Sequence, residues 1–367
     1  MKRSIYLQPT AIFWDRSGRR AVDEADLPEW KGLPLAGGRL SFAALDVLTR
    51  GSPETKRRTV VLGDAFSGDW GREALAAADI LEQLSEPRAR LAGLSLDRPR
   101  IMGIINVTPD SFSDGGEFQT TRDAVEHGLR LIEEGADILD IGGESTRPQA
   151  DDVGLNEELR RVIPVVEGLR AKTDAVISVD TRKAEVMRQA ARAGADILND
   201  VSAFTHEPDS LEIAADSGLP VIVMHAQGDP KTMNDNPQYD DVVLDVYDYL
   251  ESRVQACISA GIPKSKIIAD PGIGFGKHLH HNVAVMAGLA LYHGLGVPIL
   301  LGASRKKMIG QLCNVDDAKE RVPGSLACAI AGVAAGVQIV RVHDVKETKQ
   351  AIEVWRACSA GTEKGLD

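Results

Sequence analysis

From Pro99 onward, short apolar runs alternate with longer stretches in which apolar residues recur every three to four positions. The runs are typical of buried strands, and the stretches between them of amphipathic helices. The eight strand candidates are residues 101–105, 138–141, 176–179, 197–198, 221–224, 267–269, 299–301 and 339–342. Helices are expected between them at residues 122–134, 157–172, 183–193, 210–217, 241–260 and 283–292. Several of these helices end at a glycine, the usual left-handed helix stop, namely Gly135, Gly194, Gly218 and Gly261.

Eight parallel strands with right-handed helical crossovers over about 260 residues match a (β/α)8 TIM barrel in strand count and length. A doubly wound open sheet is the alternative. Such sheets usually have fewer strands and a glycine-rich nucleotide turn after the first one. Here the first strand is followed by Asn-Val-Thr-Pro-Asp at positions 106–110. We therefore predict an α/β protein with a (β/α)8 barrel domain over residues 99–367.

Residues 1–98 do not show this regular alternation, and we predict an additional N-terminal α+β extension there. Strands are expected at 5–13 and 60–62, short amphipathic helices at 41–49 and 72–84, and a linker at 86–99. Three of the four tryptophans lie in this region, so its composition is not that of a disordered tail. It carries no catalytic pattern. A structured cap packed on the barrel is favoured over a regulatory or oligomerisation module.

The charge balance and the cysteines limit the partners and the compartment. A net charge of −12 leaves no basic excess to neutralise a phosphate backbone, so we expect no nucleic acid partner. The four cysteines lie far apart without a Cys-x-x-Cys pair, which argues against a disulfide framework or zinc site and favours a reducing, cytoplasmic setting. The N-terminus lacks the apolar core of a signal peptide. The most apolar window, 326–340, is too short to span a bilayer, and we expect a buried helix leading into a strand.

Polar residues follow every predicted strand, and in a barrel the loops at these carboxyl ends build the active site. A single aspartate after a strand is more often a helix cap than a catalyst, but eight polar ends converging on one mouth indicate a functional site. Acceptors and an amide at strand tips suit a planar heterocycle with ring N–H and amino groups; they are Asp180, Asn199 and Asp270. Cationic side chains suit phosphate or pyrophosphate, unless they form salt bridges around the rim; they are Arg147, Lys306, Arg341 and His343. Oxygen ligands in the first loop suit Mg²⁺ bridged by substrate phosphates; they are Asn106, Asp110 and Asp114.

Two other motifs are set aside. The run Gly-Ile-Gly-Phe-Gly-Lys at 272–277 looks like a phosphate loop, but Pro271 and His278 stand where the Walker spacing requires glycine and Ser or Thr. His278, His280 and His281 are expected in a solvated loop rather than in a metal site.

Seven strings over about residues 100–358 resemble the dihydropteroate synthase family and occur in that family's order. They are Asn-Val-Thr-Pro-Asp-Ser-Phe-Ser-Asp-Gly-Gly (106–116), Gly-Gly-Glu-Ser-Thr-Arg-Pro (142–148), Ser-Val-Asp-Thr (178–181), Asn-Asp-Val (199–201), Asp-Pro-Gly-Ile-Gly-Phe-Gly-Lys (270–277), Ser-Arg-Lys (304–306) and Arg-Val-His-Asp (341–344). The resemblance implies a homodimeric transferase that joins 6-hydroxymethyl-7,8-dihydropterin diphosphate to 4-aminobenzoate. The products would be 7,8-dihydropteroate and pyrophosphate, and the cofactor Mg²⁺.

The resemblance also implies roles for individual residues. The pterin would be held by Asp180, Asn199, Asp270 and Lys306, with Met224 on the pocket wall. The diphosphate would be held with Mg²⁺ by Asn106, Arg341 and His343, and Asp114 on the mobile first loop would help to order the metal. The 4-aminobenzoate side would consist of Phe112, Thr146, Arg147, Pro148, Phe275 and Ser304. The residues assigned to catalysis are Asp180, Asp270, Lys306, Arg341 and His343.

The chemistry of the residues agrees with this resemblance. Diphosphate departure from a CH₂ beside an electron-rich pterin leaves a stabilised cation, so the enzyme must neutralise charge on the leaving group. No covalent nucleophile stands out, and an aniline nitrogen needs no strong general base. A pterin-binding methyltransferase acting on a corrinoid is the alternative, although it would not need the 304–306 string or the pair Arg341 and His343. A non-catalytic pterin-binding or scaffold protein is the third reading.

Overall fold

All eight predicted barrel strands form, and the (β/α)8 prediction is confirmed. The computed structural model describes residues 3–14, 32–51, 54–63, 73–107, 117–144, 152–228, 233 and 235–362. The strands are β5 (Arg100–Asn106), β6 (Ile138–Gly142), β7 (Val176–Asp180), β8 (Ile197–Asp200), β9 (Val221–Met224), β10 (Ile267–Asp270), β11 (Leu300–Leu301) and β12 (Ile339–Val342). They pair in parallel in the order β10-β9-β8-β7-β6-β5-β12-β11, and a parallel bridge from Ala269 to Ile299 nearly closes the ring.

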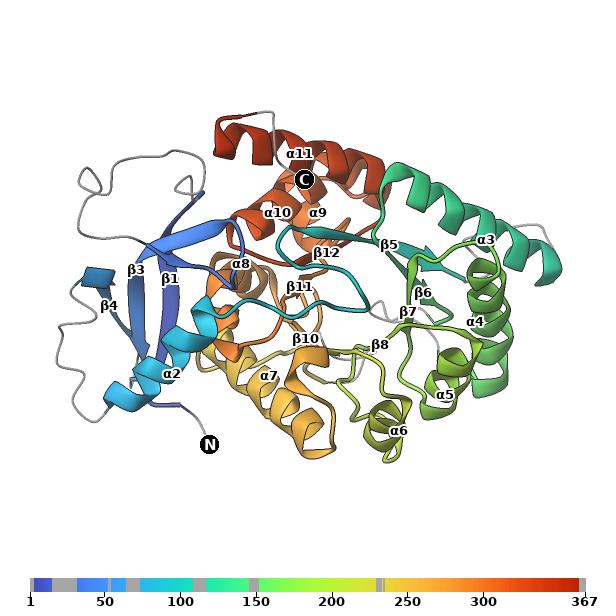
Figure 1. Ribbon diagram of the computed structural model, residues 1–367, viewed down its shortest axis with the longest axis horizontal. Coiled ribbons are helices and arrows are strands. Elements are labelled where there is room, and N and C mark those ends of the chain that lie inside the picture. Colours follow the sequence, from blue (N-terminus) through green and yellow to red (C-terminus); the bar gives the residue numbers. More distant parts are fainter. Residues whose placement is uncertain are drawn as a thin grey trace.

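The helices surround the strands as an outer layer (Figure 1). They are α3 (Glu117–Glu134), α4 (Leu155–Arg170), α5 (Ala184–Ala193), α6 (Ser210–Ser217), α7 (Val242–Ser259), α8 (Leu279–Ala287), α9 (Lys307–Cys313), α10 (Val322–Ala334) and α11 (Val345–Ala360). The helix expected at 283–292 is divided into α8 and the 3-10 helix η6 (Leu289–Leu295). Glycines 135, 194, 218 and 261 all adopt positive φ, as their place after a helix predicts.

Two-residue alternation along each strand divides the barrel interior into layers. The lower layer is apolar and consists of Met102, Ile138, Val176, Ile197, Ile222, Ile268, Leu300 and Ile339. Two residues further along each strand, the inward positions are Ile104, Asp140, Ser178, Asn199, Met224, Asp270, Gly302 and Arg341. The barrel therefore changes from apolar to polar towards the carboxyl ends of its strands, which places the candidate site there.

An antiparallel sheet with its own apolar cluster forms the N-terminal module. Its elements are β1 (Ile5–Trp14), β2 (Leu33–Pro34), β3 (Leu40–Thr49), β4 (Lys56–Val61) and α2 (Ala74–Ser85). The expected strand at 5–13 and the helix near 72–84 are confirmed, whereas the helix expected at 41–49 is wrong, because this segment is β3. Strand β3 pairs with β1 on one edge and with β2 and β4 on the other, and both of its faces are largely buried. Burial on both faces removes the polar alternation that marks a strand.

The segment expected to be a linker, 86–99, packs into the bottom of the barrel. Leu91 and Leu96 are 1% and 5% exposed and belong to the same apolar cluster as the lower interior layer. Reciprocal backbone hydrogen bonds between Leu91 and Leu94 hold the turn that presents them. The segment is thus a floor that keeps water out of the lower barrel.

Replacing Leu91 by alanine should lower the free energy of unfolding by about 2–3 kcal/mol, because the cavity would lie among rigid strand side chains that cannot collapse. Chemical denaturation of the full chain measures this loss. Leu75→Ala is the matched control, since Leu75 is 82% exposed, and it should change stability by less than about 0.5 kcal/mol. Equal losses in the two variants would contradict the assignment of a floor.

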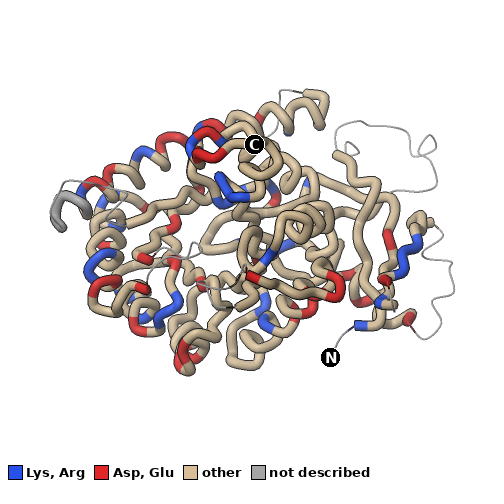
Figure 2. The backbone as a smooth tube through the Cα atoms, turned by 180° about the vertical axis from the view of Figure 1, so that it is seen from behind, with Lys and Arg blue, Asp and Glu red and all other residues tan. Residues whose placement is uncertain are grey.

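Charges are mixed over the outer surface. Figure 2 shows Lys and Arg interspersed with Asp and Glu along the helices of the visible face. None of the described helices has the length and apolarity that crossing a membrane requires.

Candidate active site

One arginine and two aspartates form the centre of the barrel mouth. Arg341, on β12, donates from Nε to Asp140 Oδ2 at 2.6 Å and from Nη2 to Asp180 Oδ2 at 2.8 Å. Asp140 is fully buried and Asp180 is 8% exposed. One guanidinium is therefore shared by two carboxylates, and it fixes the position of both.

Asp180 has a second oxygen that points to a ligand. Its Oδ1 is buried and makes no hydrogen bond within the described part of the chain. Asn199 lies beside it in register on β8, and its amide donates to Asp140 at 3.3–3.4 Å. A buried acceptor without a donor is costly, so a donor from outside the chain is the expected partner.

The electrostatics at Asp180 favour its neutral form more than usual. Burial raises its pKa above the ordinary range, Arg341 opposes the rise, and Asp140 adds to it. Because one positive charge is shared between two carboxylates, the pair retains a proton more readily than an isolated aspartate. Burial also raises the pKa of Asp270, against a hydrogen bond from Gly272 N–H and the charges of Lys306, Arg341 and Lys277.

Asp270 ends β10 and begins a loop, 271–277, that depends on glycine. Gly272 N donates to Asp270 Oδ1 at 2.7 Å. Gly272 has φ +67°, and a Cβ there would lie 1.9 Å from the carbonyl oxygen of His225, so only glycine fits against this backbone. The loop is consequently pressed onto the segment that follows β9.

Lys277 lies at the centre of this loop and is 4% exposed. Its Nζ contacts His225 Nδ1 at 2.8 Å and donates to the carbonyl oxygens of Gly272 at 2.8 Å and Phe275 at 3.1 Å. An ammonium group has donors only, so His225 accepts at Nδ1 and carries its proton on Nε2. Burial lowers the pKa of Lys277 to about 7, with Asp270 opposing and Lys306 adding to the effect. Lys277 therefore holds the loop together from inside.

The loops after β11 and β12 are tied to each other. Ser304 Oγ lies 3.0 Å from His343 Nδ1 and accepts from His343 N at 3.2 Å. Arg305 adopts φ +57°, and its Nε donates to Asp344 Oδ2 at 3.0 Å. A non-glycine residue in this conformation is held there by its surroundings. The ion pair thus sets the two loops in a fixed relation.

The cation of Lys306 lies over an aromatic ring. Its Nζ is 4.1 Å from the centroid of Phe275, which belongs to the loop after β10. Met224 ends β9 and is 3% exposed, and Asn106 ends β5 beside Gly142. The structure thus brings ten predicted site residues to the mouth: Asn106, Asp180, Asn199, Met224, Asp270, Phe275, Ser304, Lys306, Arg341 and His343.

Five predicted site residues lie outside the described residues. They are Phe112 and Asp114 in the first loop and Thr146, Arg147 and Pro148 in the second. The first-loop aspartate Asp110 also lies outside them. Within the described ranges, no three His, Cys, Asp or Glu side chains come together as a metal site.

The sequence prediction missed Asp140 and a second buried group of charges. Thr181 Oγ1 donates to Glu158 Oε1 at 2.5 Å, and Lys183 Nζ contacts both Glu158 at 2.5 Å and Glu144 at 3.3 Å. Asp140 could have been found from strand alternation, since it lies between Ile138 and Gly142 on the inward face. The group around Glu158 has no such signal, because it joins a helix to two loops.

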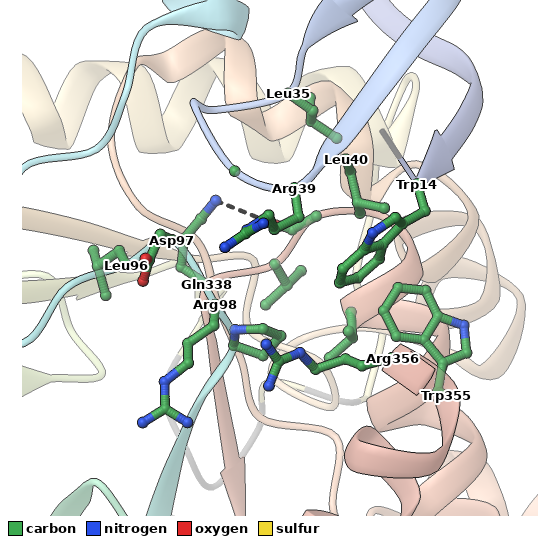
Figure 3. Close-up of a pocket in the computed structure, with 15 residues that line it drawn as sticks. Trp14, Leu35, Arg39, Leu40, Leu96, Asp97, Arg98, Gln338, Trp355 and Arg356 are labelled. Carbon is green, nitrogen blue, oxygen red and sulfur yellow. Dashed lines mark hydrogen bonds between the residues drawn. The ribbon is translucent and has the colours of Figure 1, made fainter. Parts of the chain in front are cut away.

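A further cavity lies between the N-terminal module and the floor of the barrel, away from the mouth. It is lined by residues of both parts, among them Trp14, Arg39, Trp355 and Arg356, as Figure 3 shows. Its volume is about 40 Å³, which holds only a few water molecules. The chemistry is therefore assigned to the polar mouth and not to this cavity.

Known proteins share this barrel. The profile of the family described as "Pterin binding enzyme" matches residues 102–343. The dihydropteroate synthase of Escherichia coli strain K12 is 51% identical over 275 residues, covering 75% of this chain and 97% of that protein. A Xanthomonas albilineans dihydropteroate synthase with 4-aminobenzoic acid is similar at a TM-score of 0.70 and 52% identity, over 75% of this chain and 98% of that one. The same enzyme in complex with 7,8-dihydropteroate has a TM-score of 0.68 and 49% identity, over 75% and 99%. The profile begins at residue 102, so the N-terminal module lies outside it.

Proposed function

Because the chain belongs to the dihydropteroate synthases, the pterin-binding enzymes of folate biosynthesis, we propose that its barrel mouth condenses 6-hydroxymethyl-7,8-dihydropterin diphosphate with 4-aminobenzoate. The products are 7,8-dihydropteroate and pyrophosphate. The related structures with 4-aminobenzoic acid and with 7,8-dihydropteroate support this assignment of substrate and product.

The buried Asp180 Oδ1 carries the proposal for the pterin. A dihydropterin ring presents N–H and amino donors along one edge, and this oxygen is a buried acceptor without a described partner. Asn199 lies beside it on β8, Met224 on β9 supplies an apolar wall, and Asp270 follows beside Met224 on β10 at the same inward level. Lys306, which lies near Asp270, completes the proposed pocket. A ligand that lacked these donors would leave the carboxylates unpaired, which makes the site selective.

The diphosphate is proposed to leave towards Arg341 on β12 and His343 in the loop after this strand. Arg341 and His343 are the two residues of the barrel mouth that are assigned to the diphosphate, and Asn106 lies at the end of the neighbouring strand β5. Their task is to neutralise the charge that develops on the leaving group, while the anchored ring stabilises cationic character at the CH₂. The aniline nitrogen of 4-aminobenzoate then attacks that carbon and loses its proton to solvent or to pyrophosphate.

The side of 4-aminobenzoate is proposed at Phe275 and Ser304. The ring of Phe275, under Lys306 Nζ, offers a flat apolar surface for the aromatic substrate. Phe112, Thr146, Arg147 and Pro148 are proposed to complete this side from the first two loops. The Asp114 side chain is proposed to act with Asn106 near the metal.

Mg²⁺ is proposed to bind with the diphosphate. The Asn106 amide supplies one hard oxygen ligand at the strand end, which fits an ion that takes few protein ligands and several phosphate and water oxygens. When bound, Mg²⁺ adds positive charge at the leaving group.

We also propose a homodimer formed through α8, α9 and α10. Helix α10 contains no charged residue over Val322–Ala334, and only four of its residues are buried: Ser325, Ala329, Gly332 and Val333. Beside it, Leu312 on α9 is 58% exposed and Val283 on α8 is 43% exposed. An uncharged helix with a partly exposed apolar face suits contact with a second copy. We further propose that the chain consists of two domains, residues 1–98 and 99–367. We also propose a cytoplasmic location, with which the four free cysteines agree.

The full chain should release pyrophosphate only when the pterin diphosphate, 4-aminobenzoate and Mg²⁺ are all present. A coupled pyrophosphate assay measures this, with chelation by EDTA and omission of 4-aminobenzoate as controls. Methyl transfer from methyltetrahydrofolate to cobalamin, or intact pterin binding without turnover, would contradict the proposal.

A further inference from the structure

We propose that the N-terminal module positions the substrate loop 271–277, with Arg50 as the positioning residue, acting through the first turn of α7. The proposal rests on the proposed function only where Phe275 in this loop is assigned to 4-aminobenzoate. The module lies beside α7 and α8 (Figure 1), and it lies outside the matched family profile.

Arg50, at the end of β3, binds two aspartates on α7. Its Nη1 lies 3.0 Å from Asp245 Oδ1 and its Nη2 lies 2.6 Å from Asp248 Oδ2. Tyr6 OH donates to the other oxygen of Asp248 at 2.8 Å, and Arg50 Nε donates to the same Tyr6 oxygen at 3.0 Å. All three charged side chains are less than 20% exposed. The guanidinium is thus held in one orientation and partly screened from water, unlike a surface ion pair.

The module also holds the residue that caps α7. Thr55 Oγ1 donates to Asp241 Oδ2 at 2.6 Å. Through its other oxygen, Asp241 accepts from Val243 N at 3.1 Å and from Leu244 N at 3.2 Å, so it is the N-cap of the helix. Asp245 Oδ2 accepts from Asp240 N at 2.9 Å and from Asp241 N at 3.2 Å, which fastens the chain just before the helix.

Arg50 compensates a local excess of negative charge. Four aspartates occur within residues 240–248: Asp240, Asp241, Asp245 and Asp248. Like charges three and four residues apart destabilise a helix surface. Without Arg50, Asp245 and Asp248 would repel each other on adjacent turns, and this repulsion would weaken the hydrogen bonds that Asp245 accepts from the backbone of residues 240 and 241.

The fastened segment contacts the substrate loop directly. Tyr239 OH, two residues before the cap, donates to the carbonyl oxygen of Gly276 at 2.7 Å. Gln227 and Gln238 exchange two hydrogen bonds, at 2.9 and 3.1 Å, and a Cβ on Gly276 would lie 2.5 Å from the Gln227 carbonyl oxygen. Gly276 lies between Phe275 and Lys277. A continuous set of contacts therefore runs from Arg50 through Asp245 and Tyr239 to the loop.

Arg3 provides a matched control in the same interface. Its Nε donates to Glu251 Oε1 at 2.6 Å, and its guanidinium lies 5.7 Å from the ring centroid of Tyr247. Glu251 lies on α7 roughly two and a half turns after the first residue of the helix. Arg3→Met therefore removes an ion pair between the same module and the same helix, away from the first turn.

The test uses full-length Arg50→Met, Arg3→Met, Tyr239→Phe and the double variant of Arg50 and Tyr239. Hydrogen exchange followed by mass spectrometry on the ligand-free protein should show amides of 272–278 exchanging about tenfold faster in Arg50→Met and Tyr239→Phe, and within about twofold of the parent in Arg3→Met. The KM for 4-aminobenzoate should rise about five- to tenfold in the first two variants, with kcat within about threefold. The double variant should be no worse than the more affected single one, because both changes interrupt one set of contacts.

Equal exchange in Arg50→Met and Arg3→Met would overturn the proposal, because the module would then only add stability. Effects of Arg50→Met and Tyr239→Phe that multiply would overturn it as well. Because exchange is measured without substrate, faster exchange in a protein whose parent form lacks turnover with 4-aminobenzoate would support the positioning role and overturn the proposed function instead.

Discussion

Replacing Arg341 by methionine should lower the free energy of unfolding by about 3–5 kcal/mol and remove measurable turnover, because the change leaves Asp140 and Asp180 buried without their shared cation. Methionine is similar in length to the aliphatic part of the arginine side chain. The loss of stability therefore reports the missing charge and its hydrogen bonds more than a cavity. Urea denaturation and the pyrophosphate assay measure the two effects. Binding of a bare pterin should weaken as well as binding of the diphosphate substrate, since Asp180 belongs to the proposed pterin pocket and Arg341 holds it in position.

The loss in Arg341→Met should depend on pH. In the parent protein the pKa of Asp180 is already raised on folding, so the folded state binds more protons than the unfolded chain, and this group's contribution falls as pH rises towards the raised pKa. Without Arg341 the pKa of Asp180 rises further, and the pH range over which this group lowers the stability of the fold extends to higher pH. The difference in stability between parent and variant should therefore be larger at about pH 8 than at about pH 5.

The double variant of Asp140→Asn with Arg341→Met is the control. Removing one of the two carboxylate charges should restore about half of the lost stability, because one neutral amide replaces an unpaired buried anion. A double variant as unstable as the sum of both single changes would show that the ion pair is not the source of the effect.

Replacing Lys277 by methionine should lower kcat/KM by about 100-fold and the free energy of unfolding by about 3–4 kcal/mol. The variant leaves His225 Nδ1 and the carbonyl oxygens of Gly272 and Phe275 without a donor inside a closed loop. Asp270 and Phe275, at the two ends of this backbone, would then lose their fixed geometry. Steady-state kinetics and denaturation measure the two quantities.

Lys266→Met is the matched control for Lys277→Met. Lys266 Nζ also donates to a backbone carbonyl, that of Gly218 at 2.6 Å, but the contact is exposed. Water can replace the donor there, so stability should change by less than about 0.5 kcal/mol and activity should be unaffected. If Lys277→Met proved equally mild, the loop would not depend on its buried ammonium group.

The strands and the general place of the site could be predicted because their signals are local. Each barrel strand is a short apolar run that ends at polar residues, and parallel strands with helical crossovers bring all such ends to one mouth. Asp180 and Asn199 lie at the carboxyl ends of neighbouring strands, so their proximity follows from topology alone. The helix predicted at 41–49 is wrong because the local signal is missing there. This segment is a strand buried on both faces, so it lacks the polar alternation that would distinguish it from a helix.

The contacts that set the site's chemistry could not be predicted in this way. Arg341 and Asp140 lie 201 residues apart, and the sequence-based expectation placed Arg341 at a diphosphate, without its two carboxylate partners. The sequence analysis rejects the phosphate motif that ends at Lys277 and assigns this lysine no role, because nothing in the string shows that the carbonyl groups of the loop point towards its side chain. This orientation depends on glycines with positive φ at positions 272, 274 and 276.

The sequence by itself determined the barrel, the family and the set of polar strand ends, because strand periodicity, helix stops and motif order are properties of neighbouring residues. Only the tertiary structure decided which of these side chains are paired, which are buried and which lack a partner. Those properties arise from distances between segments far apart in the chain and from the removal of water around them. For this reason, only the folded protein shows the guanidinium of Arg341 shared by two aspartates, the buried donor at Lys277 and the contacts of Arg50 with α7.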